Sequence, residues 1–255
     1  MRFASLGSGS RGNALLVESG ATRLLLDCGF GPRETTSKLG RFGLSPDDLS
    51  GILVTHEHSD HVAGAFRLAC CHRLTLMMTH GTFAAASRGI SELPAVELID
   101  SHKAFPIGDL EIHPFPVPHD AREPVQFVFS DGRHRLGVIT DLGSSTPHVQ
   151  RMLTGCDALV LECNHDGDML LRGNYPAHLK KRIGGRLGHL DNTASAALLA
   201  SLHTPGLQHL IAAHLSLQNN TPALARTALA GVLGCAEDWV GVADQDTGFD
   251  WRELL

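Results

Sequence analysis

Short apolar runs alternate with longer amphipathic stretches along almost the whole 255-residue chain. The strand-like runs occupy residues 14–18, 22–27, 51–55, 74–78, 110–117, 125–129, 135–140, 158–162 and 210–215. The helix-like stretches begin at His61, Pro147, Tyr175, Asn192 and Pro222. Strands that alternate with helices, with no low-complexity linker and no repeat, predict a single α/β domain of two or four layers over residues 1–255.

The last two helices carry clear start signals. Asp191 or Asn192 can cap the stretch TASAALLASL, because short polar side chains accept hydrogen bonds from the first-turn N–H groups. Thr221 can cap PALARTALAGVL, with Pro222 in the first turn. Both helices are expected to begin at these caps.

A glycine-rich segment near the N-terminus, LGSGSRGN, matches the spacing of a dinucleotide-binding loop. That motif requires a helix to follow, whereas the continuation reads as a β-hairpin with Ser19 and Gly20 at its turn. A dinucleotide site is therefore not expected. Two interpretations stay open: a plain tight turn, or a loop in which Ser8, Ser10 and Asn13 help to hold an anionic substrate.

The segment GILVTHEHSDHVAG, residues 51–64, places His56, His58, Asp60 and His61 directly after an apolar run. Residues two apart diverge on a strand or a helix, so these side chains converge only in a sharply turned loop. Gathering four ionisable groups without a metal would be costly. The spacing differs from H-E-x-x-H, because Asp60 stands where a zinc protease has its second histidine. The segment therefore predicts a metal site.

Three more candidate ligands follow strand-like runs: His119, Asp141 and His214. Each taken alone fits an ordinary loop residue. Together, in that order after the histidine cluster, they supply enough ligands for two ions.

The order of these seven residues resembles that of the metallo-β-lactamase superfamily. The chain is further similar to the bacterial YycJ (WalJ/VicX) branch in these stretches: LGSGSRGN, VTHEHSDH, PVPHDAREPV, TDLG, LECNHD, NYPAHLKKRI, GHLDN and AHLSLQNN. One position departs from the branch, which usually has serine after GHL where this chain has Asp191.

The resemblance implies an αββα sandwich with the site at one edge, and it implies how the ligands divide. His56, His58 and His119 would hold the first ion, Asp60, His61 and His214 the second, and Asp141 would bridge them. Zinc suits the nitrogen-rich set, with manganese as the alternative. The expected activity is that of a phosphodiesterase in which the metals share a hydroxide that Asp60 also orients, acting on DNA as a 5′ exonuclease.

Other polar residues extend this expected site. His189 and His165 are candidates for protonating the leaving group, or else for structural hydrogen bonds. The candidate substrate-binding residues of the later segments are Asn164, Tyr175, Ser216, Asn219 and Asn220, with Tyr175 able to stack on a base. The basic cluster of Lys180, Lys181, Arg182 and Arg186 fits either a solvated helix face or a grip on a phosphate backbone.

Composition narrows these hypotheses. A net charge of -6 at pH 7 argues against a generic electrostatic grip on nucleic acid, so any DNA must be held locally. The 6 cysteines include no C-x-x-C pair, and the sequence shows neither a secretory signal nor an apolar run that could span a membrane, so we expect a cytoplasmic protein. The alternatives are a hydrolase of a small phosphodiester or thioester, and a non-catalytic metal-bound regulatory protein. The oligomeric state is not indicated.

Overall fold

Alternating side chains in the central strands explain the layered architecture of the chain, whose computed structural model describes all residues 1–255. In β3 (Thr22–Leu26), Leu24 and Leu26 pack into the core between two sheets, while Leu25 packs under the helices on the outer face. In β10 (Arg135–Ile139), Leu136 and Val138 face the same inner core, and Ile139 faces outwards. Because both faces of these strands are buried, their sequences read as near-continuous apolar runs.

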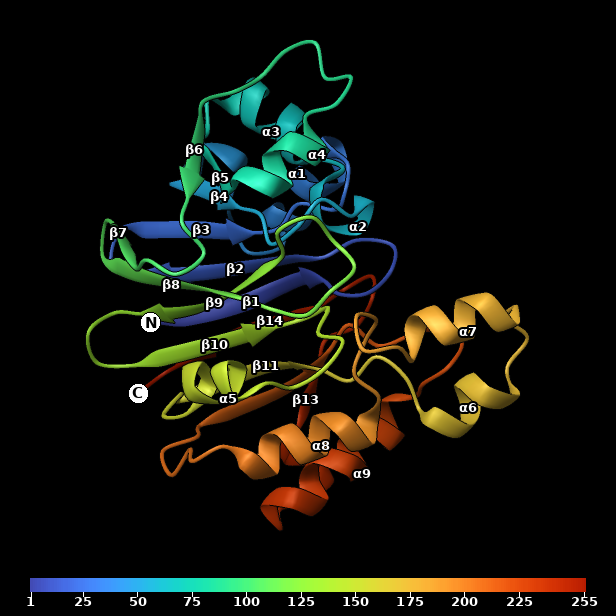
Figure 1. Ribbon diagram of the computed structural model, residues 1–255. Helices are drawn as coiled ribbons and strands as arrows, with labels where there is room; N and C mark the ends of the chain where they lie inside the picture. Colours follow the sequence, from blue (N-terminus) through green and yellow to red (C-terminus); the bar gives the residue numbers. More distant parts are fainter.

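Two seven-stranded sheets pack against each other through this inner core (Figure 1). The first has the order β14-β1-β2-β3-β4-β5-β6, with β1 (Arg2–Gly7), β2 (Ala14–Ser19), β4 (Gly51–Leu53), β5 (Leu76–Thr79), β6 (Val96–Ile99) and β14 (Phe249–Glu253). The second has the order β13-β12-β11-β10-β9-β8-β7, with β7 (Phe105–Ile107), β8 (Leu110–Pro116), β9 (Val125–Ser130), β11 (Ala158–Glu162), β12 (His209–Ala213) and β13 (Gly241–Val242).

Helices cover the outer face of each sheet. The first sheet is covered by α1 (Pro32–Gly40), α2 (Ser59–Val62), α3 (Ala65–His72) and α4 (His80–Ala86). The second is covered by α5 (Pro147–Leu153), α8 (Asn192–Ser201) and α9 (Pro222–Leu233). The predicted αββα sandwich is confirmed. None of the helices has the length and apolar character that crossing a membrane requires.

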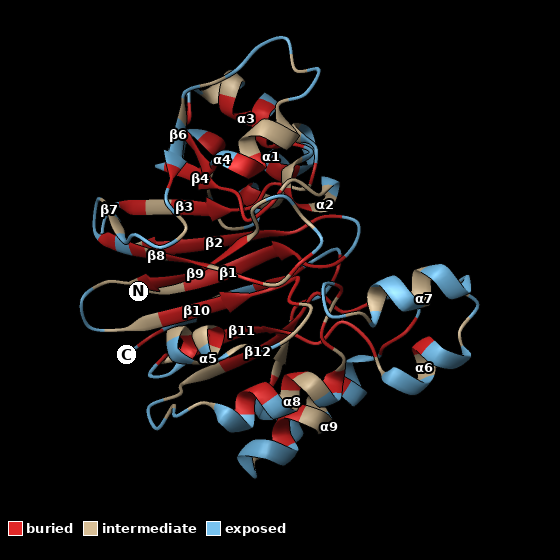
Figure 2. Cartoon of the chain, viewed as in Figure 1, coloured by how far each residue is buried: buried red, intermediate tan, exposed pale blue.

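Two more helices, α6 (Gly167–Arg172) and α7 (Ala177–Ile183), project from one end of the sandwich, and their surface is mostly exposed (Figure 2). We call residues 167–183 the helical arm. Two short 3₁₀ turns, Pro46–Asp48 and Glu237–Trp239, complete the regular structure.

Helices α8 and α9 begin at the predicted caps. The Asp191 side chain accepts a hydrogen bond from the Ala194 N–H at 2.7 Å, and Thr221 accepts one from the Leu224 N–H at 3.2 Å. The helix predicted from Tyr175 begins at Ala177.

Two sequence predictions need correction. The helix predicted from His61 begins earlier, at Ser59, and is interrupted at Gly64, where a Cβ atom would lie 1.9 Å from the Phe30 carbonyl oxygen. The β2–β3 turn lies at Gly20 and Ala21, because Ser19 still pairs with Thr22 and Gly20 takes the left-handed conformation with φ 54°.

Candidate metal centre and active site

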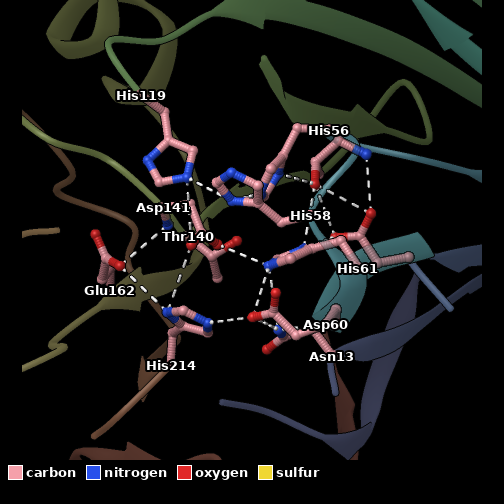
Figure 3. Close-up of polar contacts among 12 residues, drawn as sticks. Asn13, His56, His58, Asp60, His61, His119, Thr140, Asp141, Glu162 and His214 are labelled. Atoms are coloured by element: carbon pink, nitrogen blue, oxygen red, sulfur yellow. Dashed lines mark hydrogen bonds and ion pairs between the residues drawn. The ribbon is translucent and has the colours of Figure 1, made fainter. Parts of the chain in front are cut away.

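The seven predicted ligands come from loops that follow strands and meet at one edge of the sandwich (Figures 1 and 3). β4 leads into the His56–His61 loop, and β8, β10 and β12 lead to His119, Asp141 and His214. β10, β11 and β12 are parallel neighbours, so their carboxyl ends lie at the same edge of the second sheet. β8, antiparallel to β9, runs in the same direction as β10 and ends at that edge as well.

Backbone strain is concentrated at this edge. Asp27, Asp141 and His214 adopt left-handed conformations with φ values of 62°, 54° and 56°. Non-glycine residues rarely adopt this conformation, and it persists where the surrounding structure enforces it, typically at functional sites. The strain therefore marks the loops that position the ligands.

Three histidines form the first ligand group. His58 Nδ1 lies 3.0 Å from His56 Nε2 and 3.2 Å from His119 Nε2. Ligand nitrogens bound to one tetrahedral zinc ion lie roughly 3.3 Å apart, given zinc–nitrogen bonds of about 2.0–2.1 Å. Both separations from His58 are thus close to those that a single cation requires.

In the buried His56 and His119, the ring nitrogen that lies outside the first ligand group, Nδ1, has a partner in the protein. His119 Nδ1 donates to the Gly188 carbonyl at 3.1 Å, and His56 Nδ1 lies 2.9 Å from Thr55 Oγ1. Such partners set the tautomer and turn the other nitrogen towards a metal.

Asp60, His61 and His214 form the second ligand group (Figure 3). One carboxylate oxygen of Asp60, Oδ2, lies 3.5 Å from His61 Nε2 and 3.4 Å from His214 Nε2. Imidazole nitrogens and a carboxylate are borderline-hard donors that suit zinc and related divalent ions. This donor set fits a second ion.

Asp141 lies between the two groups. Its Oδ2 is 3.0 Å from His61 Nε2, and its Oδ1 is 3.8 Å from His119 Nε2. Asp141 is 2% exposed, and its Oδ2 has no partner in the protein apart from the contact with His61, which lacks hydrogen-bond geometry. A buried carboxylate oxygen without a donor is costly unless a cation satisfies it, so Asp141 fits the bridging position.

Asp27 is a functional residue that the sequence pattern did not single out. Its Oδ2 lies 2.7 Å from His61 Nδ1, and its other oxygen accepts a hydrogen bond from the Thr55 N–H at 2.8 Å. A carboxylate behind a ligating histidine orients the ring and raises its basicity. The only signal for it in the sequence is that an acidic residue ends the apolar run TRLLLD.

Glu162, at the end of the run ALVLE, is a second residue of this kind. It is fully buried and accepts backbone N–H hydrogen bonds from Asp141, Leu142 and Leu190 at 3.1, 2.9 and 3.0 Å. Burial alone would raise the pKa of Glu162, but the charge and hydrogen bond of His189, together with the hydrogen bond of His214, outweigh it and lower the pKa to about 2. The carboxylate is therefore ionised, and with three N–H donors on it we assign it to positioning rather than to metal binding.

The two histidines predicted as proton donors differ in placement. His189 lines the cavity above the metal centre, with Nδ1 2.8 Å from Glu162 Oε1 and no protein partner for Nε2. His165 is 3% exposed, lies 3.3 Å from the Asn164 side chain through Nδ1 and does not line the cavity. Geometry favours His189.

The cavity above the metal ligands has a volume of about 390 Å³. Of the predicted substrate-binding residues, Ser10, Asn164, Tyr175 and Ser216 line it. The α7 helix of the arm completes the wall with Leu179, Arg182 and Ile183.

The other four predicted substrate residues are buried and do not line the cavity: Ser8, Asn13, Asn219 and Asn220. Ser8 accepts a hydrogen bond from the His214 N–H at 2.9 Å, and Asn13 donates to the Asp60 carbonyl at 3.2 Å. Asn220 donates to the Cys163 carbonyl at 2.7 Å. These contacts hold the ligand loops rather than a substrate.

The basic cluster is divided by the fold. Arg182 lines the cavity, and its Nε lies 2.6 Å from Asp120 Oδ2, on the residue after the ligand His119. Lys180 donates to the Leu171 carbonyl at 2.7 Å within the arm. Lys181 and Arg186 are exposed.

Comparisons with known proteins agree with this geometry. The family model of the beta-lactamase superfamily domain matches residues 22–214. The chain is 37% identical over 237 residues to the exodeoxyribonuclease YycJ of Bacillus anthracis, covering 91% of this chain and 89% of that one. It is 31% identical to the exodeoxyribonuclease WalJ of Streptococcus pneumoniae, covering 94% and 91%.

Solved structures share the fold at low identity. Zn²⁺-bound PqqB from Methylobacterium extorquens has a TM-score of 0.75 at 22% identity, with 100% of both chains covered. YhfI from Bacillus subtilis has a TM-score of 0.76 at 18% identity, with 99% of both chains covered. The family model and the two relatives named exodeoxyribonucleases show that the chain belongs to the beta-lactamase superfamily of metal-dependent hydrolases, in the branch that contains YycJ and WalJ.

Proposed function

We propose that this protein is an exodeoxyribonuclease that binds two divalent ions, zinc with manganese as the alternative, and removes nucleotides from the 5′ end of DNA. The observation that carries the proposal is one cavity in which metal ligands, a histidine with a free ring nitrogen and an arginine face the same space. The full-length similarity to two proteins named exodeoxyribonucleases supports DNA as the substrate.

The seven ligands would hold the ions in the two groups described, with Asp141 between them. When bound, such ions activate water and polarise a phosphoryl oxygen. Asp60 lines the cavity with a side chain that is 19% exposed, so its carboxylate can also accept a hydrogen bond from the attacking water.

His189 would supply the proton that the leaving oxygen needs. Glu162 occupies Nδ1, which leaves Nε2 to face the substrate in the cavity. A positioned general acid of this kind typically contributes roughly 10²–10⁴-fold to the rate. Glu162 also receives the N–H groups of Asp141 and Leu142, so one carboxylate positions both the acid and the bridging ligand.

Arg182 would bind a phosphate of the strand, because it lines the cavity. Lys181 and Arg186, exposed nearby, would extend this positive region along the DNA backbone. The protein as a whole is acidic, so a DNA strand would have to be bound through these local positive charges.

The decisive experiment is product analysis with Zn²⁺ or Mn²⁺ on DNA and RNA, single- and double-stranded, labelled at the 5′ or the 3′ end. We expect early release of labelled mononucleotide from 5′-labelled DNA and slow shortening of 3′-labelled DNA. Hydrolysis of a small phosphodiester without any cleavage of DNA would overturn the proposal. Internal cuts as the first products would also overturn it.

A further inference from the structure

One face of the helical arm is apolar and turns towards the metal centre. Leu179 and Ile183 lie four residues apart on one face of α7, Tyr175 lies just before this helix, and all three line the cavity. No residue of α7 is buried, so this face packs on no protein core (Figure 2). An apolar helix face that is not needed for the core is available for a ligand.

The arm is tied to the site at both ends. At its start, the Asp166 N–H donates to the Asn219 carbonyl at 2.8 Å. At its end, the His189 N–H donates to the Ile183 carbonyl at 2.8 Å, and Arg182 pairs with Asp120 at 2.6 Å. The apolar face is therefore held opposite the metal ligands rather than swinging freely.

The cavity separates two kinds of chemistry. Its lining includes the proposed metal ligands Asp60, Asp141 and His214 and the polar residues Ser10, Asn164 and Ser216. On the arm, the ring of Tyr175 and the aliphatic side chains of Leu179 and Ile183 suit a flat apolar group. Arg182, on the same wall, is the group that suits a phosphate.

We propose that Tyr175, Leu179 and Ile183 bind the base of the terminal nucleotide, the one that the reaction releases. This inference rests on the proposed exodeoxyribonuclease function. The base is the flat apolar part of a DNA strand, and it lies one sugar away from the phosphate that the metals must reach. The 390 Å³ cavity is near the lower end of the range for ligand pockets, so it holds one nucleotide rather than a run of bases.

The test removes the base from the substrate and the ring from the protein. We compare kcat/KM for single-stranded DNA ending in thymidine with DNA ending in an abasic tetrahydrofuran residue, at the end that the wild type degrades. The enzymes are the wild type, Tyr175→Ala, Leu179→Ala and Leu171→Ala. Leu171 is the matched control, since it lies on the same arm, is 71% exposed and does not line the cavity.

The wild type and Leu171→Ala should lose roughly 5- to 150-fold in kcat/KM when the terminal base is removed, the range for one base stacked on an aromatic ring. Tyr175→Ala should lose that factor on thymidine-ended DNA and lose little more on the abasic substrate, and Leu179→Ala should behave similarly with a smaller factor. Equal activity of the wild type on both substrates would overturn the inference.

The inference would likewise be overturned if Tyr175→Ala lost as much kcat/KM as the wild type when the terminal base is removed. Neither of these results would affect the proposed function as long as the wild type degrades DNA from an end. Failure of the wild type to degrade any DNA would instead reject the proposed function itself.

Discussion

Glu162 Oε1 lies 2.8 Å from Nδ1 of His189, and the same carboxylate receives the backbone N–H groups of Asp141 and Leu142. One buried group thus connects the proposed proton donor to the bridging metal ligand. Burial alone would lower the pKa of His189, but the charge and hydrogen bond of Glu162 outweigh it and raise the pKa.

Glu162→Gln should lower kcat on DNA about 10- to 100-fold, because such outer partners position reacting groups. A general acid works when protonated, and removing the Glu162 charge lowers the pKa of His189. The alkaline limb of the kcat profile should therefore move to lower pH. The measurement is the pH–rate profile of both enzymes. In the His189→Ala background, Glu162→Gln should cost less activity than in the wild type, because only its support of Asp141 remains. Simple additivity of the two changes would contradict the coupling of Glu162 to His189.

Metal content should follow the ligand set. Protein never exposed to a chelator should contain up to two transition-metal ions per chain by elemental analysis. Asp141→Ala should contain less metal and lose hydrolytic activity, because its carboxylate lies between both ligand groups. Circular dichroism should show that the fold survives. Full activity in a metal-free wild type would contradict the two-metal proposal.

The exposed cations should affect strand binding but not the chemistry. Lys181→Gln with Arg186→Gln should reduce the slope of log K against log salt by about 1.4 on single-stranded DNA, since each lost phosphate contact contributes about 0.7. Arg182 is left in place because it pairs with Asp120 beside the ligand His119. Salt titrations of binding give the slopes, and turnover of a small chromogenic phosphodiester should stay the same. Identical slopes for the variant and the wild type would show that Lys181 and Arg186 contact only solvent.

Asp191, where the branch usually has serine, should act as a helix cap only. It accepts a hydrogen bond from the Ala194 N–H at 2.7 Å and does not line the cavity. Asp191→Ser should keep the free energy of unfolding within about 0.5 kcal/mol, and Asp191→Ala should lower it by about 1 kcal/mol. Denaturant melts measure both. A large loss of kcat in the serine variant, at unchanged stability, would assign the carboxylate a role in the reaction.

Most strands could be predicted from the order of residues, and so could the convergence of the seven proposed metal ligands at one edge of the sandwich. Strands buried on both faces require near-continuous apolar runs, and such runs, as at 158–162 and 210–215, are visible without a structure. The ligands were visible because His56, His58, Asp60 and His61 crowd together after an apolar run, and ionisable groups so placed are costly to gather unless a cation binds them.

Which polar residues serve the metals, and which face the substrate, depends on tertiary packing. Asp27 and Glu162 each appear in the sequence as one acidic residue after a strand, and only the packing of neighbouring strands brings them against His61 and His189. Ser8 and Asn13 looked like substrate residues from their loop, yet they are buried behind the ligands.

The helical arm is a second example of this dependence. Its residues read as an ordinary short helix with a basic run, and nothing in their order shows which face meets the cavity. That face is set by the Asp120–Arg182 pair and by the hydrogen bond from the His189 N–H to the Ile183 carbonyl. Contacts of this kind depend on where the folded sheets place each loop, which a local pattern does not encode.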